Sequence, residues 1–342
     1  MRASGGVPPG GIHGGTGRWL LTLLGAAVLA LSVASLGLGP VALAPGQVWQ
    51  ALWAPDSTAE ALIVQELRLP RTLLGVAVGA SLGIAGAGLQ GLLRNPLAEP
   101  GVLGISNTAA LGAVVTLYTG VAAAVPLALP AAAMAGALLS LVLLYGLAGR
   151  EANVQTLILA GVAISSLAGA LISVALNLAP SPHATTEILF WLLGSLADRG
   201  MDHVAWGLPF MAAGVALLLS AGRALDALSM GEETARSLGF NLNALRFRII
   251  TGATLAVGAG VAVSGSIGFV GLVVPHLLRP LVGYQPARLL PASALGGAIL
   301  LLLADLGLRF SPDLDLKLGV VTALVGAPFF LHLVLKTRRM TV

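Results

Sequence analysis

Three consecutive pieces of sequence decide the fold class: Arg68-Leu69-Pro70-Arg71, the apolar run from Leu73 to Leu93, and the turn Arg94-Asn95-Pro96-Leu97-Ala98-Glu99-Pro100-Gly101. An apolar run of about 20 residues is long enough to cross a bilayer core of about 30 Å. Arginines precede this run, a proline-broken turn closes it, and Gly104-Ile105-Ser106-Asn107 opens the next apolar segment. The stretch therefore predicts a membrane-spanning helix with a polar element at each end.

The composition of the whole chain extends this prediction. Of 342 residues, 57% are hydrophobic and 9% are charged, whereas a typical soluble domain has about 25% charged residues. The 45 glycines suit close packing of membrane helices. With no cysteine, disulfides and thiolate chemistry are excluded. We predict an all-α polytopic membrane protein, with a loose Gly- and Pro-rich tail over residues 1–18 and a single domain over 19–338.

Apolar runs bounded by charges, Pro and Gly predict about ten transmembrane helices. With a cytoplasmic N-terminus, thirteen of the 18 Lys and Arg residues fall on the cytoplasmic side. This distribution satisfies the positive-inside rule, so both termini are expected in the cytoplasm. Basic residues at span ends also explain the formal net charge of +4 without nucleic-acid binding. The predicted spans are 19–39, 71–93, 101–120, 126–148, 154–178, 204–222, 245–264, 267–283, 291–308 and 318–336.

A weak internal repeat accompanies these spans. Gly86, Gly88 and Gly91 near the end of the second span resemble Gly265, Gly268 and Gly271 between the seventh and eighth. A repeat of this kind would give its two halves opposite orientations, as in inverted-repeat transporters. Glycine patterns also recur by chance in such chains, so both readings stay open.

The opening stretch also resembles a family: the permease subunits of bacterial ABC importers for iron chelates, haem and cobalamin. Three further segments, in the same order, carry the resemblance, which covers roughly residues 20–338. It implies a ten-helix subunit in the cytoplasmic membrane that works as a homodimer, with two ATP-binding subunits and an extracytoplasmic solute-binding protein. The three segments are Gly231-Glu232-Glu233-Thr234-Ala235-Arg236-Ser237-Leu238-Gly239, 265–276 and 319–330.

Arg68, Arg71 and Arg309 fall on the predicted extracytoplasmic side, where positive charge is the exception. They could anchor spans by extending to lipid headgroups. They could instead dock an acidic protein, because the planar guanidinium binds carboxylates bidentately. The resemblance implies docking, since matching arginines of the family meet glutamates of the solute-binding protein. Asp305 lies four residues before Arg309, and an i,i+4 ion pair is favoured over a proton relay.

The longest polar segment between spans is the cytoplasmic loop at about 223–245. Residues 233–238 are predicted to form a short helix that Gly239 ends in a left-handed conformation. The loop could be a plain connector, although adjacent spans need only a few residues to turn. The resemblance implies a coupling element seated on the ATPase, with Ala235 and Leu238 as its apolar contact. The implied coupling residues are Gly231, Glu232, Glu233, Ala235, Arg236, Leu238 and Gly239.

Transport through the membrane needs a path, which we predict along the second span at Gly83, Gly86 and Gln90. The five histidines show no metal-ligand spacing, so no metal site and no cofactor are predicted. His276 is expected to make a hydrogen bond on the cytoplasmic side. A pore that passes an intact chelate has no need to coordinate its metal.

Absent motifs separate the remaining classes of function. No Gly-Lys dipeptide occurs, so the phosphate-binding loop of an ATPase is missing, and no nucleophile–base signature indicates a hydrolase. The chain is therefore predicted to be non-catalytic. An ion-coupled secondary transporter remains the alternative, although it would need ionisable groups near the bilayer midplane. The sequence does not distinguish ferric siderophore, the commonest cargo in the family, from haem or cobalamin.

Overall fold

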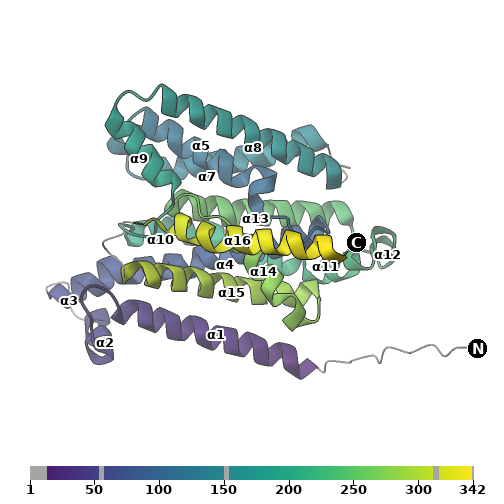
Figure 1. The fold of residues 1–342 in the computed structure, drawn as a ribbon, viewed down its shortest axis with the longest axis horizontal. Coiled ribbons are helices and arrows are strands. Elements are labelled where there is room, and N and C mark those ends of the chain that lie inside the picture. The colour runs from purple at the N-terminus through teal and green to yellow at the C-terminus, as the bar shows by residue number, and fades with distance from the viewer. Residues whose placement is uncertain (1–13, 54–57, 150–153, 311–315, 341–342) are drawn as a thin grey trace, which may run out of the picture.

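Helices occupy all ten ranges that the sequence predicts as spans (Figure 1). The computed structural model describes residues 14–53, 58–149, 154–310 and 316–340, and for 14–17, 334 and 336–340 the backbone alone. The predicted tail therefore lies mostly outside the described residues, and α1 already begins at Gly14. The helices in the predicted ranges are α1 (Gly14–Gly37), α4 (Leu69–Leu92), α5 (Ile105–Tyr118), α7 (Ala128–Ala148), α8 (Val154–Asn177), α10 (Met201–Ser220), α13 (Leu242–Ser264), α14 (Val270–Leu278), α15 (Pro286–Arg309) and α16 (Leu318–Met340).

Shorter elements connect these helices. The sequence did not predict α9, whose Ser181 side chain accepts a hydrogen bond from the Ala184 N–H, the usual N-cap arrangement. No β-strand occurs among the described residues. The short elements are α2 (Pro45–Trp53), α3 (Ala59–Leu62), the π-helix η1 (Ile63–Arg68), the 3₁₀ helix η2 (Pro100–Leu103), α6 (Val121–Ala124), α9 (Pro182–Leu192), α11 (Gly222–Ser229), α12 (Glu232–Ser237) and the 3₁₀ helix η3 (Pro280–Val282).

Among the residues that the structure describes, seven helical segments are long and apolar enough to cross a membrane. The range 267–283, predicted as one span, is instead divided into the nine-residue α14 and the short η3. Glycines at 265 and 268 precede α14, Phe269 at its start has a left-handed backbone with φ of 67°, and Pro280 follows. These residues interrupt regular helix formation. At about 1.5 Å per residue, α14 alone is too short to cross a bilayer.

Helices α4 and α13 form the centre of the bundle. In each, 78% of the most apolar window is buried, whereas only 6% is buried in α1, which lies at the periphery (Figure 1). The two central helices run in opposite directions, since α4 begins beside α3 and α13 begins beside α12 at the other end (Figure 1). Their packing partners also correspond: α4 contacts α14 and α15, as α13 contacts α5 and α7. This exchange of partners agrees with an inverted repeat.

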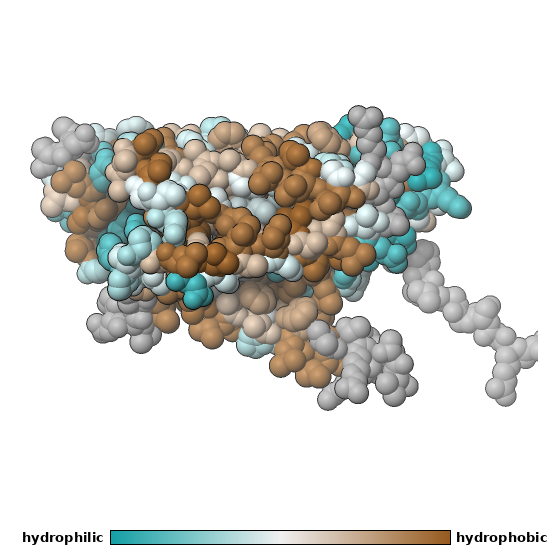
Figure 2. All heavy atoms as spheres, turned by 90° about the horizontal axis from the view of Figure 1, so that it is seen from above, coloured by the Kyte–Doolittle hydropathy of each residue, from teal (hydrophilic) through white to brown (hydrophobic). Residues whose placement is uncertain are grey.

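The molecule has two polar ends and an apolar belt between them. Figure 2 shows hydrophobic surface across the middle and hydrophilic surface gathered at both ends. Helices α2, α3 and α9 lie at one end, and α11 and α12 at the other (Figure 1). The first described turn of α1 and the last of α16 lie at the α12 end (Figure 1). Following the orientation that the sequence predicts, we call the α3 end the outer end and the α12 end the inner end.

Candidate functional site: an outer arginine cluster and an inner loop

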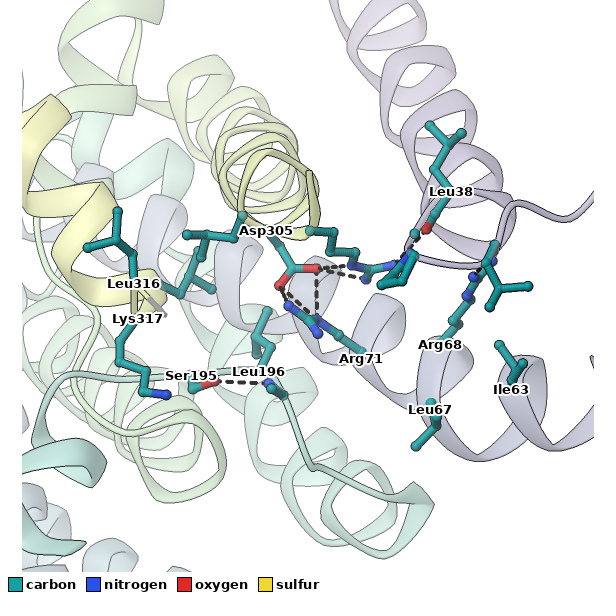
Figure 3. A pocket seen from close by; sticks show the side chains of 17 residues that line it. Leu38, Ile63, Leu67, Arg68, Arg71, Ser195, Leu196, Asp305, Leu316 and Lys317 are labelled. Atoms are coloured by element: carbon teal, nitrogen blue, oxygen red, sulfur yellow. Dashed lines mark hydrogen bonds and ion pairs between the residues drawn. The ribbon is translucent and has the colours of Figure 1, made fainter. Parts of the chain in front are cut away.

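Arg68 is buried where η1 meets α4, with 6% of its surface exposed. Its Nη1 donates to the carbonyl oxygens of Leu36 and Gly37, both at 2.8 Å, and its Nη2 donates to the carbonyl of Val41 (Figure 3). The last carbonyls of a helix have no partner within the helix, and a cation is favourable beside them. Arg68 therefore fastens the end of α1 to α4.

Asp305 of α15 faces Arg71 of α4 at the outer end (Figure 3) and also pairs with Arg309 of its own helix. Its carboxylate is 2.8 Å from Arg71 Nη2 and 2.7 Å from Arg309 Nη2. The predicted pair with Arg309 is confirmed, whereas the bond with Arg71 crosses 234 positions of sequence and was not foreseen. Arg309 also donates from Nη1 to the Ser35 carbonyl at 2.7 Å and from Nη2 to the Ser35 hydroxyl at 3.0 Å.

These four residues, Arg68, Arg71, Asp305 and Arg309, form what we call the outer arginine cluster. The cluster contains three guanidinium groups and one carboxylate, which only Arg71 and Arg309 bind, so its formal charge is +2. The cluster borders a cavity of about 460 Å³ whose other lining residues are mostly apolar, with Lys317 on the opposite wall (Figure 3). Of the two arginines that bind Asp305, Arg71 has the more accessible side chain: 24% of it is exposed, against 6% for Arg309. The cluster is thus internally bonded and still electropositive.

The inner loop forms the predicted short helix. α12 begins after Gly231, whose φ of 117° requires glycine, and is closed by Gly239 with φ of 83° and an N–H donated to the Arg236 carbonyl at 2.9 Å. Glu232 lies 3.3 Å from Arg246 of α13 and 3.7 Å from Arg236. The Arg246 contact ties α12 to the long central helix α13.

The apolar contact surface of α12 differs from the prediction. Ala235 is fully buried within the chain, so it packs α12 against its own subunit and is not available to a partner. Leu238 is 57% exposed, and Glu233 and Arg236 are exposed as well. A helix of six residues has one narrow inward face, and the smallest side chain occupies it. The surface that α12 offers to a partner is therefore mainly polar, with one leucine.

The predicted pathway residues lie between helices of the same subunit. A methyl group on Gly83 would collide with the Ser293 carbonyl of α15, and one on Gly86 with the Gly271 carbonyl of α14. Gln90 is buried, donates to the Gly271 carbonyl at 3.3 Å and accepts from Arg279 at 2.5 Å. In this conformation all three residues serve close helix packing, and their role in a pathway stays a prediction.

Metal ligands do not gather in the part of the chain that the structure describes, where no group of three or more His, Cys, Asp and Glu residues lies together. The His276 ring instead packs edge-on against Phe329 of α16, with 5.6 Å between ring centroids. Sequence reasoning missed the contacts of Ser35 and the position of Arg71 opposite Asp305. Neither has a local signal, because each depends on how α1, α4 and α15 pack.

An α-helical bundle with an apolar belt, polar groups at both ends and two antiparallel central helices defines a multi-pass membrane protein. The chain belongs to the FecCD transport family, whose family model matches residues 27–336. The resemblance read from the sequence motifs is thereby confirmed.

Relatives match this chain over nearly its whole length. It is 40% identical over 316 residues to the Fe(3+)-citrate import system permease protein YfmE of Bacillus subtilis, covering 92% of this chain and 93% of that protein. It is 42% identical over 295 residues to the vitamin B12 import system permease protein BtuC of Vibrio cholerae, covering 85% and 88%. A solved structure of an inward-facing metal-chelate type ABC transporter has a TM-score of 0.83 and 32% identity, covering 93% of this chain and 99% of that one.

Proposed function

We propose that this chain is the permease subunit of a binding-protein-dependent ABC importer that moves a metal chelate into the cytoplasm. The observation that carries this proposal is full-length similarity to permeases of ferric citrate and vitamin B12 import. Two copies of the chain would enclose the path, and two separate ATP-binding subunits would hydrolyse ATP. The cargo would be a ferric siderophore or ferric citrate, with cobalamin and haem as the other members of the class.

The outer arginine cluster supports docking of a solute-binding protein. Its formal charge of +2 attracts an acidic surface, and the Asp305 bonds hold the guanidinium planes of Arg71 and Arg309 in fixed orientations. These arginine side chains would then lose little conformational entropy when a carboxylate of the partner binds to them. Among the three predicted docking residues, Arg68 would act mainly by holding α1, since its donors already bind carbonyl groups.

The inner loop supports coupling to the ATPase. The exposed side chains of Glu233, Arg236 and Leu238 would contact the ATP-binding subunit. Glu232 would transmit the movement, because its ion pair with Arg246 joins α12 to the central helix α13. Energy for transport would come from the different affinities of the partners for the two access states.

The path itself would lie on a surface that a second copy can cover. An apolar groove between α9, the 265–269 connection and α16 exposes small residues at Gly319, Ala323 and Ala327. Small side chains let helices of two subunits approach closely. An ion-coupled transporter receives no comparable support, since Asp305, the acid that the sequence offered for ion coupling, is held between two arginines.

Uptake in cells that lack this gene tests the proposal. Radiolabelled ferric citrate, ferric siderophores, cobalamin and haem would be offered separately, with the wild-type gene restored as a control. Loss of one cargo, rescued by the wild type, would name the substrate. Unchanged uptake of all of them, in cells that carry no second importer for these compounds, would contradict the metal-chelate assignment.

A further inference from the structure

Asp226 joins two helices that meet at the inner end of the molecule. It belongs to α11, which directly precedes α12 in the inner loop, and it is partly buried. Its Oδ1 accepts a hydrogen bond of 2.8 Å from the backbone N–H of Ala287, in the first turn of α15 and 61 positions further along the chain. The transport proposal leaves this carboxylate without a role.

The first turn of α15 has no cap from its own sequence. Its N-cap residue, Gln285, makes no side-chain cap bond, and Pro286 at the first helical position has no N–H to donate. The N–H of Ala287 is one that an N-cap side chain normally satisfies. Pro291 cannot donate to the Ala287 carbonyl one turn back, so the helix also holds this turn by one bond fewer. Asp226 supplies the acceptor from α11, and its negative charge is favourable beside a helix N-terminus.

A close approach of α11 to α15 accompanies this hydrogen bond. A methyl group on Gly222, the first residue of α11, would lie 3.1 Å from both the Cα and the Cβ of Ala287. Carbon atoms in ordinary contact are about 3.5–4.0 Å apart, so glycine allows the two helices to come closer than alanine would. α11 packs in turn against α12. The Asp226 bond is therefore part of a continuous contact that runs from α12 through α11 to α15.

The inner loop is attached on its other side to α13. There Glu232 of α12 lies 3.3 Å from Arg246. The central helix α4 packs against both α13 and α15. The inner loop thus bridges two helices that share α4 as a neighbour, with one polar contact to each of them.

We propose that Asp226 is a positioning residue for transport: it fastens the inner loop to the first turn of α15, as Glu232 fastens the loop to α13. The loop then sets the spacing of α13 and α15 at the inner end. A displacement of α12 by the ATP-binding subunits changes that spacing, because both helices are held by the loop. The inference rests on the proposed function, which supplies the displacement, while the bond itself lies within one subunit.

The spacing of α13 and α15 can be measured directly. The chain contains no cysteine, so two introduced cysteines are the only sites that a spin label would modify. We would label Arg248→Cys on α13 and Gln285→Cys at the start of α15, both at exposed positions. Double electron–electron resonance in lipid nanodiscs, with the ATP-binding subunits bound, would give the distance distribution with and without a non-hydrolysable ATP analogue. Labelled chains would be diluted with unlabelled ones, so that distances within one subunit dominate.

Three variants and a control separate the bond from general stability. Asp226→Ala removes the acceptor, whereas Asp226→Asn keeps an acceptor oxygen and removes the charge. Gly222→Ala leaves the carboxylate in place and forces α11 away from Ala287. Asp202→Ala, at an exposed aspartate in the first turn of α10 at the other end of the molecule, is the matched control.

We expect the nucleotide to change the ratio of two distance populations at least about fivefold in the wild type, in Asp202→Ala and in Asp226→Asn, and below about twofold in Asp226→Ala, since ordinary coupling between sites begins near fivefold. Gly222→Ala should give a reduced change. A merely structural role of Asp226 would alter unfolding and leave the nucleotide response as it is.

The possible failures are distinct. If the ATP-binding subunits are retained, a wild-type response in Asp226→Ala, or no response in the wild type, would overturn the inference and leave the importer assignment standing. A wild-type chain that does not bind the ATP-binding subunits would contradict the proposed function, and this inference with it.

Discussion

The arginines at the two ends of the molecule differ in what they bind. Arg309 at the outer end has 6% of its side chain exposed and bonds to Asp305 and Ser35, whereas Arg236 at the inner end is 65% exposed with one carboxylate at 3.7 Å. Both stand near helix ends in the sequence. The position of an arginine along the chain therefore does not show whether its side chain is bonded within the subunit or exposed to a partner.

Physical conditions at each end explain the difference. At the outer end, α1 stops against α4 and α15, and its last carbonyls require donors. A buried carboxylate there also needs positive partners, because an unpaired buried charge is costly. At the inner end, Arg236 faces solvent, where an isolated pair is worth only about 0–1 kcal/mol. The outer arginines therefore stabilise the fold, whereas the inner arginine contributes little to stability.

Removing the charge of Asp305 should produce the largest effect. In Asp305→Asn, Arg71 and Arg309 lose their shared carboxylate, and breaking a buried pair in this way costs about 3–5 kcal/mol. Thermal unfolding in detergent, calibrated with a denaturant, would measure the loss. Asp202→Asn, at a side chain that is 62% exposed, is the control and should change stability much less. Equal stability of both variants would show that the cluster is not structural.

Replacing arginine by lysine should sharpen the same comparison. Arg309→Lys keeps the charge and loses the planar fork that reaches Asp305 and Ser35 together, so we expect destabilisation of about 1.5–3 kcal/mol. Arg236→Lys should stay within about 0.5 kcal/mol of the wild type, as for an ordinary surface change. The two unfolding curves, recorded side by side, would check this. Similar losses in both variants would remove the distinction between the ends.

Salt concentration should affect the docking affinity more than the folding stability. Raising salt from about 0.1 M to about 1 M shortens the screening length from about 10 Å to about 3 Å. Affinity for the solute-binding protein should fall several-fold, since the cluster acts across solvent, while the buried Asp305 pairs keep most of their strength. Surface plasmon resonance and unfolding curves over the same salt series give the two values. Salt-independent docking would indicate that apolar contacts dominate it.

Much of the fold followed from local sequence. Apolar length located helices in all ten ranges, and Gly239 correctly ended α12, because each depends on residues close together in the chain. The Asp305–Arg309 pair was also local, since the two residues are four positions apart. In contrast, the span predicted at 267–283 is interrupted because Phe269 takes a left-handed backbone and packs against Gly326 of α16. No residue close to Phe269 in the sequence indicates that contact.

The candidate sites were less predictable than the helices. Nothing near Arg71 in sequence shows that Asp305 lies opposite, and nothing near Arg68 shows that its donors meet the end of α1. Gly83 and Gly86 were expected to line a pathway, yet small residues serve equally well where backbones touch. Residue types indicated which interactions a side chain can make, and tertiary packing determined whether it makes them within the subunit or at the surface.

One paired measurement tests whether the outer end docks the solute-binding protein and the inner end binds the ATPase. Arg71→Glu and Arg236→Glu would be compared in the same importer, recording affinity for the solute-binding protein and retention of the ATP-binding subunits. We predict that Arg71→Glu weakens docking about tenfold or more, a loss of about 1.4 kcal/mol, and leaves the ATPase bound. Arg236→Glu should loosen the ATPase and leave docking unchanged. The opposite pattern, or no effect of either reversal, would contradict the assignment of the two ends.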